Sequence, residues 1–145
     1  MPSVRDTIRF FDIEKQLMPG MTALIIGKRC SGKSILLFDI MSRMDGWFNF
    51  GLALTPTQSS KAKFSQAIPD VMIDKQSVER LDTYVQMINK LYDQCTAQGK
   101  PTKKTFLLCD DTAYDDKFMR SKTLSEVFLN GRQFGCTCLL VLQYL

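Results

Sequence analysis

The sequence predicts an α/β domain in which a mainly parallel sheet lies between two layers of helices. Its apolar runs are short and unbroken, which is typical of strands buried on both faces. Segments with helical periodicity separate these runs, as in repeated strand–helix–strand units. The 145 residues, of which 45% are apolar and 23% charged, suffice for one domain with a continuous core.

The expected elements alternate along the chain after a lead-in segment of residues 1–20. In order, they are a strand at 22–26, a helix at 33–44, strands at 47–54 and 71–73, a helix at 77–98, a strand at 105–109, a helix at 117–130 and a strand at 136–142. Right-handed crossovers place the carboxyl ends of parallel strands along one edge of the sheet. Ligands of open α/β sheets bind at that edge.

Two of the helices have clear internal signals. From Val78 to Cys95, apolar residues recur at spacings of 3, 4, 3, 4 and 3, and this pattern predicts one helix face packed on the sheet. In the last helix, Thr123 and Glu126 stand at the spacing of a capping box, and Gly131 marks the end.

Composition narrows the class of protein. Five cysteines without a CxxC pair, and no histidine, argue against a zinc site or a disulfide framework and favour a reducing compartment. Cys136 and Cys138 alternate along a strand, so we expect them in the core. No apolar run approaches the roughly 20 residues of a membrane span. The net charge of +4 permits an anionic partner without requiring one.

One segment matches the phosphate-binding pattern G-x-x-x-x-G-K-[ST] at every fixed position. It lies between the first strand and the first helix and comprises Gly27, Lys28, Arg29, Cys30, Ser31, Gly32, Lys33 and Ser34. Its glycines let backbone N–H groups surround a phosphate, and the helix start adds a positive dipole. We expect Lys33 to neutralise the β- and γ-phosphates of ATP and Ser34 to ligate Mg²⁺. The sequence thus predicts a P-loop NTPase three-layer sandwich.

Two carboxylates follow the strand at 105–109. A buried strand that carries an acid to the edge of the sheet is how P-loop domains hold Mg²⁺, so we expect Asp110 to be a metal ligand. Asp111 is then placed to act as a general base on the attacking water. The alternative interpretation is that one of the two aspartates only caps the following turn.

Two further candidates stand near the end of the chain. Gln143 closes the last strand at the ligand edge, where its amide can orient water or sense the γ-phosphate; an ordinary strand-end glutamine is the alternative. Arg132 follows the last helix, where it can reach a neighbouring subunit as an arginine finger; a surface arginine is the alternative. Lys61 and Lys63, after the second strand, either contact phosphate or belong to a solvated face.

With these motifs placed, the chain resembles the genome-packaging ATPases of the large nucleocytoplasmic DNA viruses, which belong to the FtsK-HerA class of ring-shaped DNA motors. The resembling segments are 25–29, 31–34, 55–57, 68–70, 110–111, 114–115, 128–132 and 142–144. The resemblance implies an ATPase that uses Mg²⁺ and moves double-stranded DNA, a homo-oligomeric ring, capsid components as partners, and a location in the host cytoplasm or the virion. It also implies Gln143 as γ-phosphate sensor and Arg132 as a finger acting in trans.

The sequence departs from this family in two places. Cys30 stands where the family usually has glycine, so a non-glycine residue must accept the backbone angles of the loop. The family continues beyond the sensor glutamine into a further strand that lies beside the P-loop strand. We therefore expect residues 1–145 to be a single but incomplete domain, truncated at its C-terminus, in which the strand at 22–26 is an open apolar edge.

Two other hypotheses stay open. A GTPase would show Asn-Lys-x-Asp after the Asp110 strand, but the nearest string, at 89–93, precedes that strand and has the wrong spacing. A small-molecule kinase would show a basic lid, and the three cations within residues 117–122 are a weak candidate for one. The first of these hypotheses is thus another P-loop enzyme. The second is a truncated relic that binds nucleotide without activity, and the intact Lys33, Ser34 and Asp110 argue against it.

Overall fold

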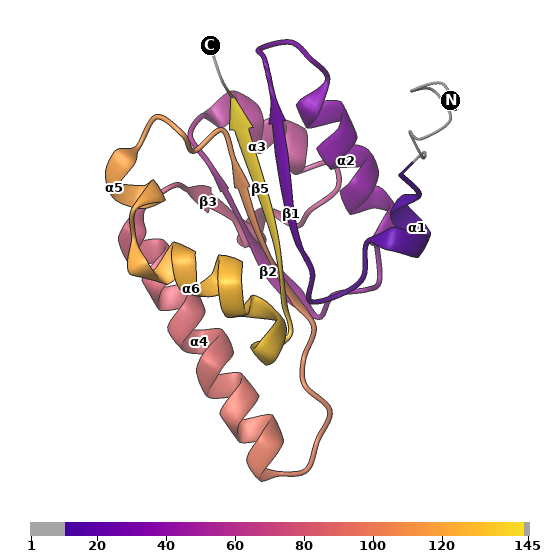
Figure 1. The fold of residues 1–145 in the computed structure, drawn as a ribbon, viewed down its shortest axis with the longest axis vertical. Helices are drawn as coiled ribbons and strands as arrows, with labels where there is room; N and C mark the ends of the chain where they lie inside the picture. Colours follow the sequence, from indigo (N-terminus) through magenta and orange to yellow (C-terminus); the bar gives the residue numbers. More distant parts are fainter. Residues whose placement is uncertain (1–10, 144–145) are drawn as a thin grey trace, which may run out of the picture.

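The computed structural model describes residues 11–143 and confirms a three-layer α/β architecture (Figure 1). The strands are β1 (Thr22–Gly27), β2 (Phe50–Thr55), β3 (Ile73–Lys75), β4 (Thr105–Asp110) and β5 (Cys136–Gln143). The helices are α1 (Ile13–Gln16), α2 (Lys33–Arg43), α3 (Gln58–Phe64), α4 (Val78–Ala97), α5 (Asp116–Met119) and α6 (Lys122–Asn130), with 3₁₀ turns η2 (Asp70–Met72) and η3 (Gly131–Phe134). Part of the expected lead-in, residues 1–10, lies outside the described residues, as does Tyr144.

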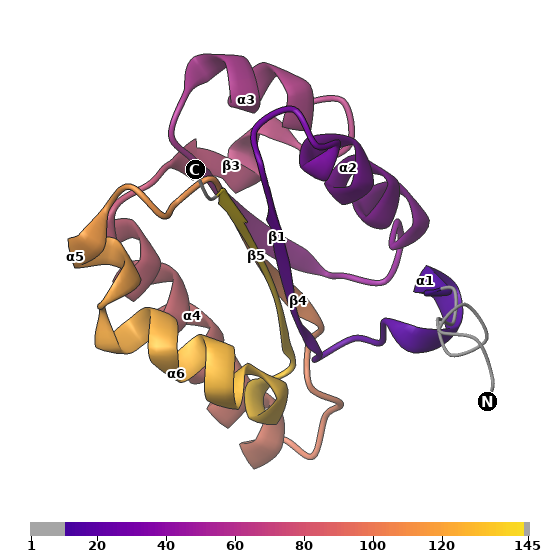
Figure 2. The ribbon, with the colours of Figure 1, turned by 45° about the horizontal axis from the view of Figure 1, so that its top comes forward.

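The strands form one sheet in the order β1-β5-β4-β2-β3, and every neighbouring pair is parallel. Helices α1, α2 and α3 cover one face, and α4, α5 and α6 cover the other (Figure 2). This is the arrangement that apolar strands alternating with helices predict. Among the described residues, no helix has both the length and the apolar content needed to cross a membrane.

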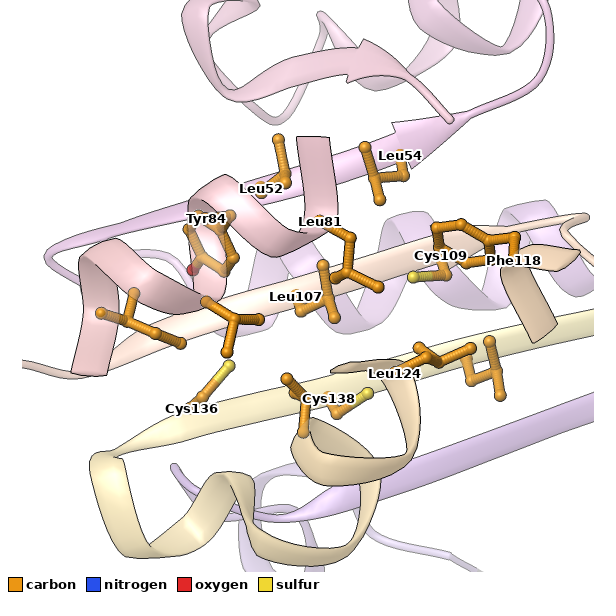
Figure 3. Packing of buried hydrophobic residues seen from close by; sticks show 14 of the residues in the cluster. Leu52, Leu54, Leu81, Tyr84, Leu107, Cys109, Phe118, Leu124, Cys136 and Cys138 are labelled. Carbon is orange, nitrogen blue, oxygen red and sulfur yellow. The ribbon is translucent and has the colours of Figure 1, made fainter. Parts of the chain in front are cut away.

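Alternation of side chains along the strands divides the core in two. One cluster fills the space under α4 and α6, where Leu107 and Cys109 of β4 meet Cys136 and Cys138 of β5 (Figure 3). The second lies under α2 and α3 and takes the opposite residues of the same strands, among them Leu108. Cys136 and Cys138 have no exposed surface, so the prediction that they belong to the core is confirmed.

Strand β1 forms one edge of the sheet, as the sequence predicted. Its Leu24 and Ile26 are 46% and 57% exposed although they are large and apolar. The Thr22 hydroxyl donates to the carbonyl of Phe128, so the end of α6 reaches only the start of the strand. Beyond that point, among the described residues, these two side chains of β1 stay open to solvent.

Several expected boundaries were wrong for local reasons. Strand β2 begins at Phe50 rather than at residue 47, because the Trp47 N–H donates to Met44 and continues the turn that ends α2. Strand β3 begins at Ile73 rather than at residue 71, because η2, with Pro69 as its N-cap, takes the residues before it. Helix α3 was missed altogether, since its sequence QSSKAKF carries almost no apolar pattern.

The helix expected at 117–130 is two helices, α5 and α6, broken at residues 120–121. The expected capping box at Thr123 was wrong. The side chain of Ser121 caps α6 by accepting the Leu124 N–H, while the Thr123 hydroxyl donates to Asp82 of α4. The Thr123 hydroxyl, two residues after the cap, therefore ties α6 to α4 instead of capping the helix.

Candidate functional site

The topology brings three carboxyl ends together. Strand β5 lies between β1 and β4, with Gly27 opposite Gln143 in one ladder and Asp110 opposite Val141 in the other. The Asp111 N–H extends the second ladder by donating to the Val141 carbonyl at 3.1 Å. Residues that are far apart in the sequence therefore end side by side at one edge of the sheet.

The same alternation that divides the core aims the polar side chains at one face. Leu108 and Val141 pack in the cluster beneath α2. Two residues further along, Asp110 and Gln143 continue the same face of β4 and β5. Both strands therefore present their terminal polar side chains on the side where the loop between β1 and α2 lies.

That loop has the backbone of a phosphate cradle. A Cβ on Gly27 would lie 2.6 Å from the Ser31 hydroxyl, so a side chain at this position would force Ser31 to move. Gly32 is the N-cap of α2 with φ of 86°, a left-handed conformation that glycine adopts without strain. Helix α2 then begins at Lys33, so its first N–H groups and its positive dipole end face into the loop.

Lys33 reaches back across the loop mouth. Its ammonium donates to the carbonyls of Gly27 at 2.8 Å and Lys28 at 2.6 Å. The amine is thereby held over the concave side of the loop, where a phosphate surrounded by the loop would meet it.

Two residues in this region have a strained backbone. Cys30 has φ of 58° and Asp111 has φ of 53°, and in the described chain no other residue besides glycines has a positive φ. Such conformations are rare for side chains other than asparagine and aspartate, and they concentrate at ligand clamps and active sites. Both residues line the same cleft.

The cleft has a volume of about 420 Å³. Its lining residues are Arg29, Cys30, Ser31, Gly32, Lys33, Ser34, Ile35, Ser60, Lys63, Asp110, Asp111 and Gln143. The candidate residues predicted from the sequence are among them except Gly27 and Lys28, which contribute the carbonyls above, and Lys61 and Arg132.

Opposing effects act on the pKa of the Asp110 carboxyl. The side chain is only 6% exposed, and burial raises the pKa of its carboxyl. The neighbouring charge of Asp111 raises that pKa further, while the ammonium groups of Lys33 and Lys63 lower it. The Asp110 carboxylate and the Ser34 hydroxyl line one cleft, and both are oxygen donors of the kind that Mg²⁺ takes together with phosphate.

Arg132 lies elsewhere. It belongs to η3, which precedes β5, whereas the cleft is at the far end of that strand. Its Cγ would be 3.5 Å from a Cβ placed on Gly20, in the segment that enters β1. The eight residues of β5 span roughly 25 Å. Arg132 is therefore excluded from the cleft of its own subunit.

Sequence reasoning missed Ser60 and gave Lys63 no preference over Lys61. Both Ser60 and Lys63 are on α3, and they line the cleft, whereas Lys61 does not. The signal was Thr57, whose hydroxyl caps the helix by accepting the Ser60 N–H at 3.1 Å. Recognising that cap would have predicted the helix, and residues 60 and 63 then share one face of it.

A parallel sheet with this strand order, a glycine-rich loop leading from the edge strand into a helix, and an aspartate at the end of a neighbouring strand define a P-loop NTPase domain. The chain belongs to the family of the poxvirus A32 protein, whose model matches residues 9–145. This confirms the resemblance to viral genome-packaging ATPases. No relative was found among curated proteins.

Among solved structures, the chain is similar to B204, the DNA-packaging ATPase from Sulfolobus Turreted Icosahedral Virus. The two share 16% sequence identity with a TM-score of 0.58, over 88% of this chain and 67% of B204. At this identity the likeness shows a common fold, and about a third of the B204 chain has no counterpart in the matched region.

The exposure of the cysteines makes the cleft testable by alkylation. Cys30 is exposed, whereas Cys95, Cys109, Cys136 and Cys138 are buried, and burial raises the pKa of Cys136 and Cys138 to about 12. Iodoacetamide at pH 8 should therefore modify Cys30 first, as read by peptide mass spectrometry. Mg²⁺-ATP at ten times its Kd should slow that reaction roughly tenfold, because only the free fraction of the protein reacts. Equal rates with and without nucleotide would place the nucleotide away from Cys30, and a Cys30→Ser variant supplies the control for other sites.

Proposed function

We propose that this chain is the ATP-hydrolysing domain of a motor that moves double-stranded DNA during viral genome packaging. Membership of the poxvirus A32 family supports the motor, and the DNA-packaging activity named for B204 agrees with it. The observation that carries the proposal is the convergence of the P-loop, Asp110, Asp111 and Gln143 on one cleft. The motor would act as a ring of identical subunits, with capsid components as further partners, in the host cytoplasm or the virion.

Each residue of the cleft has a role in this proposal. The loop from Gly27 to Ser34 binds the phosphates of ATP, and Lys33 neutralises the β- and γ-phosphates. Ser34 and Asp110 would hold Mg²⁺, and the charge of the metal would offset that of the phosphates. These contacts would position the nucleotide for attack by water. Such positioning is a main source of catalysis in phosphoryl transfer.

Asp111 and Gln143 act on the attacking water. Asp111 accepts its proton as general base, and the Gln143 amide orients the water or senses the γ-phosphate. The left-handed backbone of Asp111 supports this role, because the residue leaves the strand after its N–H bonds to Val141 and its side chain lines the cleft. The same intact set of residues argues against an inactive relic.

Replacing Asp111 by asparagine should separate binding from hydrolysis. Asparagine tolerates the left-handed backbone that residue 111 adopts, so the loop should keep its shape. ATP affinity measured by calorimetry should stay within about twofold, while the hydrolysis rate should fall roughly 10²- to 10⁴-fold, the contribution of a general base. Asp116→Asn, in an exposed and loosely paired aspartate of α5, is the matched control. Turnover of Asp111→Asn within a factor of two of the unmodified chain would make Asp111 a structural residue.

We assign Arg132 a role in the cleft of a neighbouring subunit. Because it is excluded from its own cleft, it stabilises phosphoryl charge only if it enters the cleft of a neighbour. Loss of such a residue should leave ATP binding intact and lower the hydrolysis rate of the assembled state roughly 10³- to 10⁵-fold.

A mixing experiment tests this role. Arg132→Ala and Lys33→Ala subunits should each be inactive alone, and mixed assemblies should regain partial ATPase activity, because some interfaces pair an intact P-loop with an intact arginine. A mixture of Lys33→Ala with Asp111→Asn is the control, and there an intact Arg132 from either variant faces only a defective cleft. No recovery in an Arg132→Ala mixture whose co-assembly is verified by sedimentation would refute a role in trans.

A further inference from the structure

Helix α3 forms the wall of the cleft that faces the P-loop. It follows β2, which pairs with β4 on the side opposite β5, so the helix begins beside the carboxyl end that carries Asp110. Its N-terminus is fixed because Thr57 caps it and the Thr57 and Ser60 hydroxyls are 3.1 Å apart. Figure 2 shows α3 next to the loop between β1 and α2.

Ser60 and Lys63 stand one turn apart on the same face of α3. Both line the cleft together with Ser34 and Asp110, the two residues assigned to the metal. Besides Arg29 and Lys33, which come from the loop and the start of α2, the cleft therefore has a cation supplied by α3, on the β2 side of the strand that carries Asp110. Lys61, on another face of the same short helix, does not line the cleft.

Among the residues that the structure describes, Lys63 has no acidic partner that would make it an ordinary surface ion pair. Within residues 11–143, the ion pairs use Lys15, Arg43, Arg80 and Arg120, and none includes Lys63. Lys63 lines the cleft together with the Asp110 carboxylate, which metal binding would engage. A flexible cation beside a carboxylate already committed to a metal is free to bind a further anion.

We propose that Lys63, with the hydroxyl of Ser60 beside it, binds the terminal phosphate of the nucleotide and so distinguishes ATP from ADP. The inference rests on the proposed function, because it assigns a ligand to the same cleft. The loop backbone would surround the α- and β-phosphates, while Lys33 and the metal held by Ser34 and Asp110 would act on the β- and γ-phosphates. A cation on the far side of the residues that hold the metal consequently faces the phosphate that only ATP has.

The test compares nucleotides rather than activities alone. Lys63→Gln removes the charge and keeps most of the side-chain length, Lys63→Arg keeps the charge, and Lys61→Gln makes the same change on the face of α3 that points away. Calorimetry with Mg²⁺ should show that Lys63→Gln binds a non-hydrolysable ATP analogue roughly ten- to a hundredfold more weakly, the range expected for a lost charged hydrogen bond. Its affinity for ADP should change less than about twofold, Lys63→Arg should restore most of the loss, and Lys61→Gln should match the unmodified chain.

Other results overturn the proposal in distinguishable ways. Equal weakening for ADP and the ATP analogue would assign Lys63 to the inner phosphates or to the shape of the helix. Unchanged affinity for both nucleotides would mean that Lys63 is an ordinary solvated lysine without a role in nucleotide binding. A loss confined to binding of a fluorescent double-stranded DNA, measured by anisotropy without nucleotide, would assign it to the DNA backbone. If the unmodified chain binds neither nucleotide, the proposed function itself fails, whatever the Lys63 variants do.

Discussion

Strand β5 is the element on which the site depends, because it makes hydrogen-bond ladders with β1 on one side and β4 on the other. Those two registers alone decide that the P-loop, the aspartate pair and Gln143 meet at one edge. A shift of either ladder by one residue would turn Asp110 or Gln143 to the opposite face, under α4 and α6. The apolar run from Cys138 to Leu142 in β5, and the pairing of that strand on both sides, prevent such a shift, so the geometry of the cleft follows from the packing of the core.

Once the register is fixed, electrostatics and backbone strain shape the site. A carboxylate as buried as Asp110 is costly to ionise alone, and positive charge arrives from two separate elements, α2 with Lys33 and α3 with Lys63. The backbone strain at Cys30 and Asp111 lies in the same cleft. Strain of this kind persists only where surrounding structure holds it, here the helix start after Gly32 and the hydrogen bond from Asp111 to Val141.

Much of this arrangement could be predicted from the sequence, because its main signals are local. The glycine pattern before α2, the apolar run that ends in two aspartates and the periodicity of α4 each identify an element without reference to the rest of the fold. The failures came where tertiary contacts or weak patterns decided the outcome. Helix α3 has almost no apolar periodicity, so Ser60 was missed and Lys63 could not be distinguished from Lys61. Thr123 was expected to cap a helix, but its hydroxyl bonds to Asp82 on α4. The remoteness of Arg132 from its own cleft depends on the length of β5 and on where η3 lies, which the sequence indicates only in outline.

The central claim is that the loop from Gly27 to Ser34, with Lys33 over its mouth, binds the phosphates of ATP. Calorimetric titration of the chain and of Lys33→Ala with Mg²⁺-ATP tests it most directly, with Lys117→Ala on the exposed surface of α5 as the control for loss of a charge. The account predicts saturable binding to the unmodified chain and to Lys117→Ala, and an affinity for Lys33→Ala that is lower by roughly a hundredfold or more, as expected when a buried phosphate loses its ammonium partner. The same affinity in Lys33→Ala as in the unmodified chain, with both proteins folded by circular dichroism, would contradict it.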